Sequence, residues 1–317
     1  MKPNLVYSPG YDLSFWGLER LHRFDARRHS RAWSVILEQG GHEILNRWTQ
    51  PPAPVSDQAL LRVHTPAYLD SLHSSAVVAK ALEFWPCRFV PNAILQSKVL
   101  RPMRLAVEGT VIATDLALRD GIAMNIGGGY HHAFRGHGEG FCVFADVAVS
   151  IAAHRATGRL GPHDPVVVID LDAHRGNGFE DAVRGDASIS ILDLYNFQVY
   201  PGLHQGEPEQ FPFMVPVRAS TTSAEYLQVV REELSGFLTS VPRPQVVFYV
   251  AGTDIVSGDR LGGMQVSPEA VGQRDRLVVE ALAGRGIPTV IVTGGGYSQG
   301  SHRLVAQLAL YVCNRFA

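Results

Sequence analysis

The amino-acid sequence predicts an α/β protein in which helices cover both faces of a mostly parallel central sheet, a three-layer α/β/α arrangement. Short, nearly uninterrupted apolar runs alternate along the chain with longer segments of helical periodicity, as expected of buried strands joined by helical crossovers. No linker, low-complexity tract or repeat divides the 317 residues, of which 46% are hydrophobic and 18% are charged. We therefore expect one domain that spans residues 1–317.

Six runs, most of them rich in β-branched residues, are the predicted strands. They are Leu5–Tyr7, Ile122–Ile126, Val166–Leu171, Ile189–Leu192, Val246–Val250 and Thr289–Val292. Most are apolar at nearly every position, which indicates strands that are buried on both faces.

Six longer segments carry apolar residues at i, i+3 and i+4 spacing and are the predicted helices. They are Arg27–Glu38, Pro102–Leu118, Ala145–Ala156, Ser223–Leu238, Pro268–Ala283 and Ser301–Val312. Pro102 and Pro268 suit a first helical turn, where the missing amide hydrogen is not needed. The segment Phe84–Gln96 shows no clear period, which predicts a long loop.

The composition argues against several classes of function. A net charge of −2 without a long basic run gives no electrostatic footprint for nucleic-acid binding. No apolar run approaches the ~18 residues of a membrane span, and the polar start of the chain, Met1 to Ser8, does not resemble a signal peptide. The three cysteines, Cys87, Cys142 and Cys313, are odd in number and far apart, which favours reduced thiols in a cytoplasmic protein.

Polar residues end the strand predicted at Val166–Leu171. Side chains alternate between the two faces of a strand, so Asp170, Asp172 and His174 are predicted to share one face. Such groups are costly to bury unless they are paired or bind a metal. Parallel sheets place their chemistry at the carboxyl ends of the strands, which is where this row lies.

Three other predicted strands also end in unusual residues. The strand at Ile122–Ile126 is followed by His131 and His132, the one at Val246–Val250 by Asp254, and the one at Thr289–Val292 by Tyr297. Converging strand ends would bring Asp254 to Asp172 and His174, a ligand set that suits Zn²⁺ with an open position and would also accept Fe²⁺ or Co²⁺. A histidine beside an acidified water and a tyrosine facing a developing oxyanion are the groups that hydrolysis needs. The glycines before Tyr297 lack the Gly-Lys-Ser/Thr of a phosphate-binding P-loop.

With these residues in place, the chain resembles the zinc-dependent histone deacetylases of the arginase/deacetylase superfamily. The motifs that carry the resemblance are Gly128-Gly-Tyr-His131-His132-Ala133, Gly140-Phe141-Cys142, Asp170-Leu-Asp172-Ala-His174, Ala251-Gly-Thr-Asp254 and Gly294-Gly295-Gly-Tyr297. Further segments are similar to class IV, the smallest subgroup: Phe15–Glu19, Val99–Pro102, Phe141–Asp146, Asp193–Asn196 and Gly258–Gly263. The resemblance runs from about Asn4 to the last helix and implies the arginase/deacetylase fold and one histone-deacetylase-like catalytic domain.

The resemblance also implies a role for each matching residue. The implied ligands of one Zn²⁺ per chain are Asp172, His174 and Asp254, and the implied catalytic residues are His132 as general base and then acid, His131 as its charge-stabilising neighbour, and Tyr297 on the scissile carbonyl. The implied substrate tunnel comprises Phe141, Tyr200, Gly140 and Gly295, with Leu261 at the rim. Asp170 would orient His131 and help to hold a structural K⁺, and Asn177 would support His132.

Asn177 departs from the class I pattern, which has an acid at this position. An amide accepts a hydrogen bond from His132 but cannot neutralise an imidazolium. We therefore expect His132 to be less basic than with a carboxylate partner, which favours the neutral base at pH 7.

The reaction implied is hydrolysis of an Nε-acyl-lysine amide in a peptide or protein. Similarity to class IV implies a preference for long fatty acyl chains over acetyl, and nothing in the sequence specifies a histone. One alternative is an acetylpolyamine or other small-molecule amide deacetylase, against which Leu261 argues because polyamine-type relatives place an acid near the rim. A non-enzymatic alternative is a zinc-holding module that binds acyl-lysine, against which the presence of His132 and Tyr297 argues.

Overall fold

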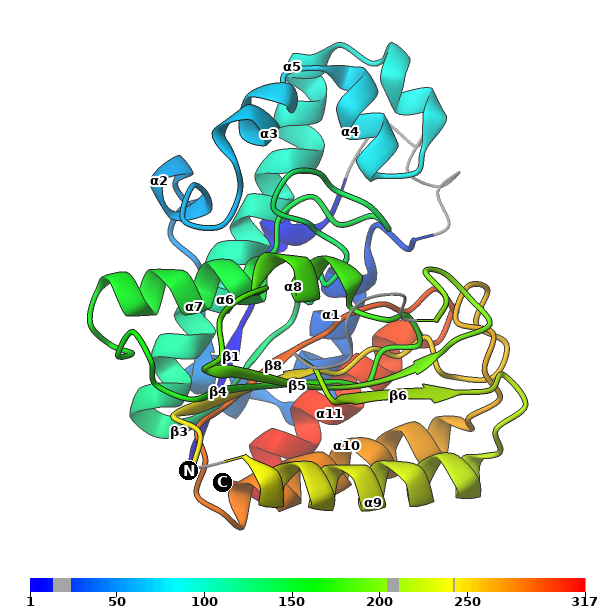
Figure 1. Ribbon diagram of the computed structural model, residues 1–317. Helices are drawn as coiled ribbons and strands as arrows, with labels where there is room; N and C mark the ends of the chain where they lie inside the picture. Colours follow the sequence, from blue (N-terminus) through cyan, green and yellow to red (C-terminus); the bar gives the residue numbers. More distant parts are fainter. Residues whose placement is uncertain (14–23, 204–210, 242, 317) are drawn as a thin grey trace.

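Eight parallel strands form one sheet at the centre of the molecule (Figure 1). The computed structural model describes residues 1–317 except 14–23, 204–210, 242 and 317, and the counts given below refer to these described residues. The strands are β1 (Lys2–Val6), β2 (Trp48–Thr49), β3 (Gly121–Asn125), β4 (Val166–Asp170), β5 (Ile189–Asn196), β6 (Phe213–Val217), β7 (Val246–Val250) and β8 (Thr289–Val292). Their spatial order is β2-β1-β3-β8-β7-β4-β5-β6.

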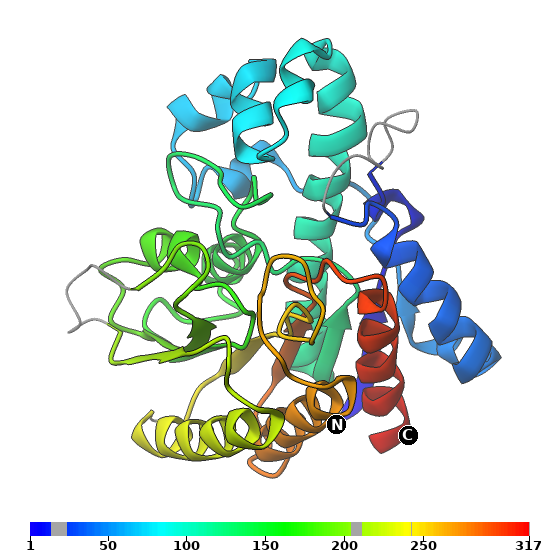
Figure 2. The ribbon, with the colours of Figure 1, turned by 90° about the vertical axis from the view of Figure 1, so that its right-hand side faces the viewer.

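Helices cover both faces of this sheet, which confirms the predicted three layers (Figures 1 and 2). One face carries α1 (Arg28–Gly40), α9 (Ser223–Ser240), α10 (Pro268–Ala283) and α11 (Ser301–Arg315). The other carries α6 (Arg101–Asp120), α7 (Asp146–Ala156) and α8 (Asn177–Ala182). A group of short helices extends beyond α6: α2 (Asp57–Leu60), α3 (Pro66–Ser71), α4 (Ser75–Ala81) and α5 (Asn92–Leu95).

The apolar strands supply two hydrophobic cores at once. In β4, Val166 and Val168 belong to the core shared with α6 and α7, whereas Val167 and Ile169 belong to the core shared with α9, α10 and α11. The period of two therefore places alternate residues in opposite layers, and neither face of β4 is left to water.

The helix starts follow local sequence signals. Pro268 is the first residue of α10, and the hydroxyl of Ser267 accepts a hydrogen bond from the amide of Ala270. At α9, Thr222 and Glu225 form a reciprocal capping box. Each cap satisfies amide groups that a helix leaves without an internal partner.

Three details differ from the sequence prediction. The strand expected at Val166–Leu171 ends at Asp170, so the period of two does not extend to Asp172 and His174, which lie in the following loop. The loop expected at Phe84–Gln96 contains a 3₁₀ turn at Trp85–Phe89 and helix α5, which are too short to show a helical period. Edge strands β2 and β6 were not predicted, because β2 has two residues and β6 contains Pro216.

The order of the strands decides which loops meet. Asp170 of β4 pairs with Val250 of β7, and Val250 pairs with Val292 of β8. The loops after these three strands therefore start side by side at the carboxyl edge of the sheet, although they are far apart in the sequence. β3 lies on the other side of β8, so its loop reaches the same edge.

Candidate metal centre

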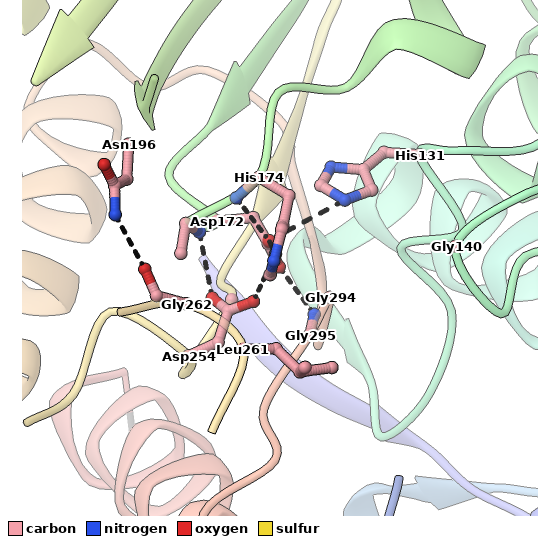
Figure 3. Close-up of polar contacts among 12 residues, drawn as sticks. His131, Gly140, Asp172, His174, Asn196, Asp254, Leu261, Gly262, Gly294 and Gly295 are labelled. Atoms are coloured by element: carbon pink, nitrogen blue, oxygen red, sulfur yellow. Dashed lines mark hydrogen bonds and ion pairs between the residues drawn. The ribbon is translucent and has the colours of Figure 1, made fainter. Parts of the chain in front are cut away.

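Three buried side chains converge at the carboxyl edge of the sheet, where Asp172 and His174 follow β4 and Asp254 follows β7 (Figure 3). One ligand atom from each lies within 4.8 Å of the other two. His174 Nδ1 is 2.9 Å from Asp254 Oδ2 and 3.2 Å from Asp172 Oδ1. The structure thus brings together the three residues that the sequence predicted as metal ligands.

Backbone amides hold the two carboxylates in place. The amide of Ala173 donates to Asp254 Oδ1 at 2.9 Å, and the amide of Gly295 donates to Asp172 Oδ2 at 2.6 Å. The amide of His174 donates to Asp172 Oδ1 at 3.0 Å. Because these donors belong to short loops anchored on neighbouring strands, the carboxylates are oriented before any ion binds.

The charges of this cluster favour a bound cation. Burial and the neighbouring Asp172 raise the pKa of Asp254 to about 7. Burial alone would lower the pKa of His174, but the hydrogen bonds that its ring donates to Asp172 and Asp254, together with their negative charge, outweigh burial and hold that pKa well above its usual range. Two buried carboxylates beside one imidazole are stabilised by positive charge, and this donor set of two oxygens and one nitrogen fits a divalent metal ion.

Two adjacent histidines from the loop after β3 lie beside this cluster. His131 Nδ1 contacts Asp170 Oδ2 at 2.8 Å, and His132 Nδ1 contacts Asn177 Oδ1 at 2.7 Å. The ring centroids of the two histidines are 4.2 Å apart, and the His132 ring lies 5.9 Å from that of His174. The partner of His131 is thus a carboxylate, whereas the partner of His132 is a neutral amide, although the two histidines occupy the same buried pocket.

The two histidines have opposite proton affinities. Burial disfavours a charged His131, but the carboxylates of Asp170 and Asp172 outweigh it and raise its pKa to about 9. Burial lowers the pKa of His132 well below its usual value, and His131 and His174 lower it further. The expectation of a weakly basic His132 agrees with this geometry, with burial as the larger cause and its amide partner unable to offset it.

Tyr297 completes the group from the loop after β8. Its ring stands edge-on to His174 and to Phe141, with centroids at 6.1 and 5.7 Å, and its amide donates to Asp259 Oδ2 at 2.7 Å. Burial, Asp254 and Asp172 hold the pKa of the phenol well above its usual value. The hydroxyl therefore keeps its proton at neutral pH and can act as a donor.

A mainly apolar cavity opens onto these residues. Its lining includes His131, His132, Tyr297 and, of the predicted tunnel residues, Gly140, Phe141 and Gly295. Tyr200 and Leu261, also predicted for the tunnel, are not among its lining residues in the part of the chain that the structure describes. The lining also includes Leu82, Phe84, Cys87, Met103 and Arg28.

Comparison with known proteins decides the family. The sequence matches the histone deacetylase domain over residues 22–314. It is 41% identical over 305 residues to histone deacetylase 2 of Arabidopsis thaliana, a match that covers 96% of this chain and 77% of that protein. The chain belongs to the histone deacetylase family.

More distant relatives extend this result. The chain is 30% identical over 311 residues to an uncharacterized protein of Picosynechococcus, with 96% of each chain covered. It is 26% identical over 265 residues to histone deacetylase 8 of Xenopus laevis, covering 78% of this chain and 76% of that protein. As a histone deacetylase family member, the chain is a hydrolase that acts on amides, with an arginase/deacetylase fold. The non-enzymatic alternative is therefore set aside.

Two buried arginines support this site, and sequence reasoning gave neither of them a role there. Arg28, in the first turn of α1, donates through Nη2 to the carbonyl of Gly294 at 2.6 Å. Arg274 of α10 donates through Nη1 to the carbonyls of Leu171 and Gly252 at 2.9 and 2.7 Å, so it joins the loops after β4 and β7. Both lie in predicted helices, where an arginine normally faces water, so no local signal marks them.

A second pair of acids, Asp170 and Asp193, lies on neighbouring strands close to His131. Asp170 Oδ1 accepts from the amide of Asp172 at 3.1 Å, and Asp193 of β5 accepts through Oδ2 from the amide of Gly176 at 2.8 Å. Asp193 Oδ1 is buried and has no hydrogen-bond partner among the described residues. A buried carboxylate oxygen of this kind fits a bound cation.

The class IV motif Phe15–Glu19 lies outside the described residues. Within the described ranges, no helix combines the length and the apolar character that spanning a bilayer would require.

Proposed function

We propose that the chain is a zinc-dependent hydrolase of Nε-acyl-lysine amides. The observation that carries the proposal is a buried Asp-His-Asp cluster beside two histidines of opposite proton affinity and a protonated tyrosine, the last three of which line one mainly apolar cavity. Each of these features serves one need of amide hydrolysis.

The side chains divide the work as follows. A zinc ion held by Asp172, His174 and Asp254 would polarise the scissile carbonyl and acidify the attacking water. His132 is neutral at pH 7, so it takes the proton of that water and returns it to the departing lysine amine.

The remaining two residues stabilise charge. His131 is held protonated by Asp170 and supplies positive charge beside the reacting centre. The Tyr297 hydroxyl donates to the carbonyl oxygen as that oxygen becomes negative in the transition state.

The test compares two variants with the parent on a fluorogenic acetyl-lysine peptide. His132→Ala and Tyr297→Phe should each reduce kcat by at least about a hundredfold, the usual scale for losing an acid–base or oxyanion group. Their zinc content, measured by mass spectrometry, should equal that of the parent, because neither residue is a proposed ligand. Full activity in either variant would contradict its assigned role.

The acyl group is proposed to be a long fatty chain. The apolar side chains that line the cavity together with His131 and His132 support this, since each buried CH₂ contributes about 0.8 kcal/mol. Comparing kcat/KM for acetyl-, octanoyl- and myristoyl-lysine peptides tests the proposal. A clear preference for acetyl would contradict it and leave the zinc-dependent deacetylase assignment intact.

Small acylated amines remain a second candidate. Leu261 argued against them, yet two acids lie beside the cavity wall: Glu83 Oε1 accepts from the amide of Gly140 at 3.2 Å, and Glu139 precedes that residue. Acidic groups there would attract a cationic substrate. Turnover of acetylspermidine at a kcat/KM above that of the peptides would favour this candidate.

Three finer assignments accompany the proposal. K⁺ would sit by Asp170, where Asp193 Oδ1 has no hydrogen-bond partner in the described part of the chain, and a rise in melting temperature with K⁺ but not with Li⁺ would support it. Class IV membership rests on the motifs quoted above, and phylogenetic placement tests it. A cytoplasmic location agrees with three free, buried cysteines, and fractionation of cells that express the tagged protein tests it.

A further inference from the structure

The catalytic histidine is connected to the protein surface by an unbroken line of polar contacts. It begins at Asn177, whose Oδ1 accepts from the Gly178 amide at 3.0 Å and faces His132 Nδ1 at 2.7 Å. Because the Gly178 amide can only donate, this atom of Asn177 is the oxygen, and the amide nitrogen points away from His132.

The nitrogen of Asn177 faces a tyrosine. Asn177 Nδ2 donates to Tyr200 Oη at 3.4 Å, and the Tyr200 hydroxyl makes a short hydrogen bond to Glu139 Oε2. A phenol has one proton, and an ionised carboxylate can only accept. The Tyr200 proton therefore points to Glu139, which leaves an oxygen lone pair for Asn177.

The outer end of the line is anchored as well. Glu139 Oε1 lies 3.0 Å from His137 Nε2, and the side chain of Glu139 is 33% exposed. The Tyr200 ring packs edge-on against the His132 ring, with centroids at 5.1 Å. The ring of Tyr200 thus contacts His132 directly, and its hydroxyl is linked to His132 through the side chain of Asn177.

We propose that Glu139 and Tyr200 are positioning residues that fix the orientation and the tautomer of His132 through Asn177. Glu139 and the Gly178 amide together set the direction of every hydrogen bond: Tyr200 donates outward, Asn177 donates to Tyr200, and His132 must donate from Nδ1 to the oxygen of Asn177. Nε2 of His132 is then left without a proton and free to act as the base. This inference rests on the proposed role of His132.

The arrangement compensates for the neutral partner of His132. A carboxylate in place of Asn177 would select the Nδ1–H tautomer by itself, because it only accepts hydrogen bonds. An amide can present either its oxygen or its nitrogen, so its orientation has to be enforced by neighbours. Gly178 enforces it on the oxygen side, and Tyr200 together with Glu139 enforces it on the nitrogen side.

The test uses zinc-loaded enzyme and a substitution that removes only the hydroxyl. Tyr200→Phe keeps the ring contact with His132 and should lower kcat about fivefold to tenfold, the effect of one lost hydrogen bond, while KM stays within about twofold. Glu139→Ala should act similarly, and Glu139→Gln should recover part of the loss because its amide oxygen still accepts from Tyr200. Tyr311→Phe is the matched control, since Tyr311 also donates to a glutamate, Glu280, between α10 and α11.

A spectroscopic readout separates positioning from a general structural effect. Long-range ¹H–¹⁵N spectra of histidine-labelled protein distinguish Nδ1–H from Nε2–H imidazoles, and the His132 signals are those that vanish in His132→Ala. The parent should show the Nδ1–H form, and Tyr200→Phe should show a measurable fraction of the other tautomer.

Two outcomes overturn the inference. In the first, both Tyr200→Phe and Glu139→Ala keep the kcat and the His132 tautomer of the parent protein. In the second, the substitutions change only KM, which would make Tyr200 a wall of the tunnel and nothing more. An inactive parent, or full activity in His132→Ala, would instead overturn the proposed function.

Discussion

Replacing Gly295 by alanine tests the position of the metal centre with a single methyl group. A Cβ built on Gly295 lies 2.4 Å from Asp254 Oδ2 and 2.8 Å from Asp172 Oδ2, whereas real Cβ contacts are essentially never shorter than 3.0 Å. The closer carboxylate must therefore move by at least 3.0 − 2.4 = 0.6 Å. The backbone of Gly295 is not in the left-handed region, so the methyl group acts by steric contact alone.

This displacement is large on the scale of metal coordination. Ligand distances in metal sites hold to within about 0.2 Å, so moving one of three ligands by 0.6 Å disrupts the geometry. We expect a loss of zinc affinity of about 10- to 100-fold, which corresponds to roughly 1.4–2.8 kcal/mol.

Zinc affinity would be measured by competition with a chromogenic chelator, and kcat/KM on an acetyl-lysine peptide at saturating zinc. The matched control is Gly136→Ala, in the loop after His132, where a Cβ would meet nothing within 4 Å. If Gly295→Ala bound zinc as tightly as the parent and the control, the ion would not lie between Asp172 and Asp254.

The other predictions concern stability and each has its own measurement. Arg274→Met should lower the free energy of unfolding by about 3–5 kcal/mol in urea titrations, because buried Asp275 loses its cationic partner and keeps only the Tyr249 hydroxyl, while the carbonyls of Leu171 and Gly252 lose this donor. An effect below about 1 kcal/mol would show that the loops after β4 and β7 do not depend on it. Burial lowers the pKa of His64 to about 4, so the unfolded chain binds more protons than the folded chain between pH 6.5 and 4, and stability should fall by at most ~3 kcal/mol as the pH is lowered through that window. His64→Gln should flatten this pH dependence of the free energy of unfolding, measured from pH 7.5 to 4.5. An unchanged slope would assign the dependence to other groups. Removing the metal with a chelator should lower the melting temperature, since zinc at a hundred times its Kd adds about 2.7 kcal/mol; restoring zinc should reverse the shift in the parent and less fully in Asp254→Asn. Gly236→Ala in the exposed face of α9, where the new methyl group meets nothing, should raise stability by about 0.5–1 kcal/mol without changing kcat, as calorimetry and the peptide assay can check.

Local patterns determined much of this protein. The apolar run at Val166–Ile169 predicted a doubly buried strand, and Ser267-Pro268 predicted a helix start, because both depend on residues that are neighbours in the chain. The polar residues after the strands were also predictable as a site, because a parallel sheet places the carboxyl ends of all its strands at one edge, whatever the order of the strands.

Exceptions arose where local signals are weak. The run expected to reach Leu171 ends at Asp170, because the Asp172 amide turns back to the Asp170 carboxylate and starts the loop that aims the ligands. The short helical turns between Phe84 and Gln96 span too few residues for a periodic pattern. In each case packing or a single hydrogen bond outweighed propensity.

Only the tertiary structure decided which distant residues act together. The order β8-β7-β4 places Gly295 against Asp254 and Asp172, and no periodicity in the sequence encodes that order. Arg274 crosses to Leu171 and Gly252, and Glu139 meets Tyr200 across 61 residues, through contacts whose partners lie on other elements. The sequence by itself determined the type of each functional group and its place at the carboxyl edge of the sheet, because both depend on residues that are close together in the chain. The pairing of those groups depends on the packing of whole elements, which a one-dimensional pattern does not contain.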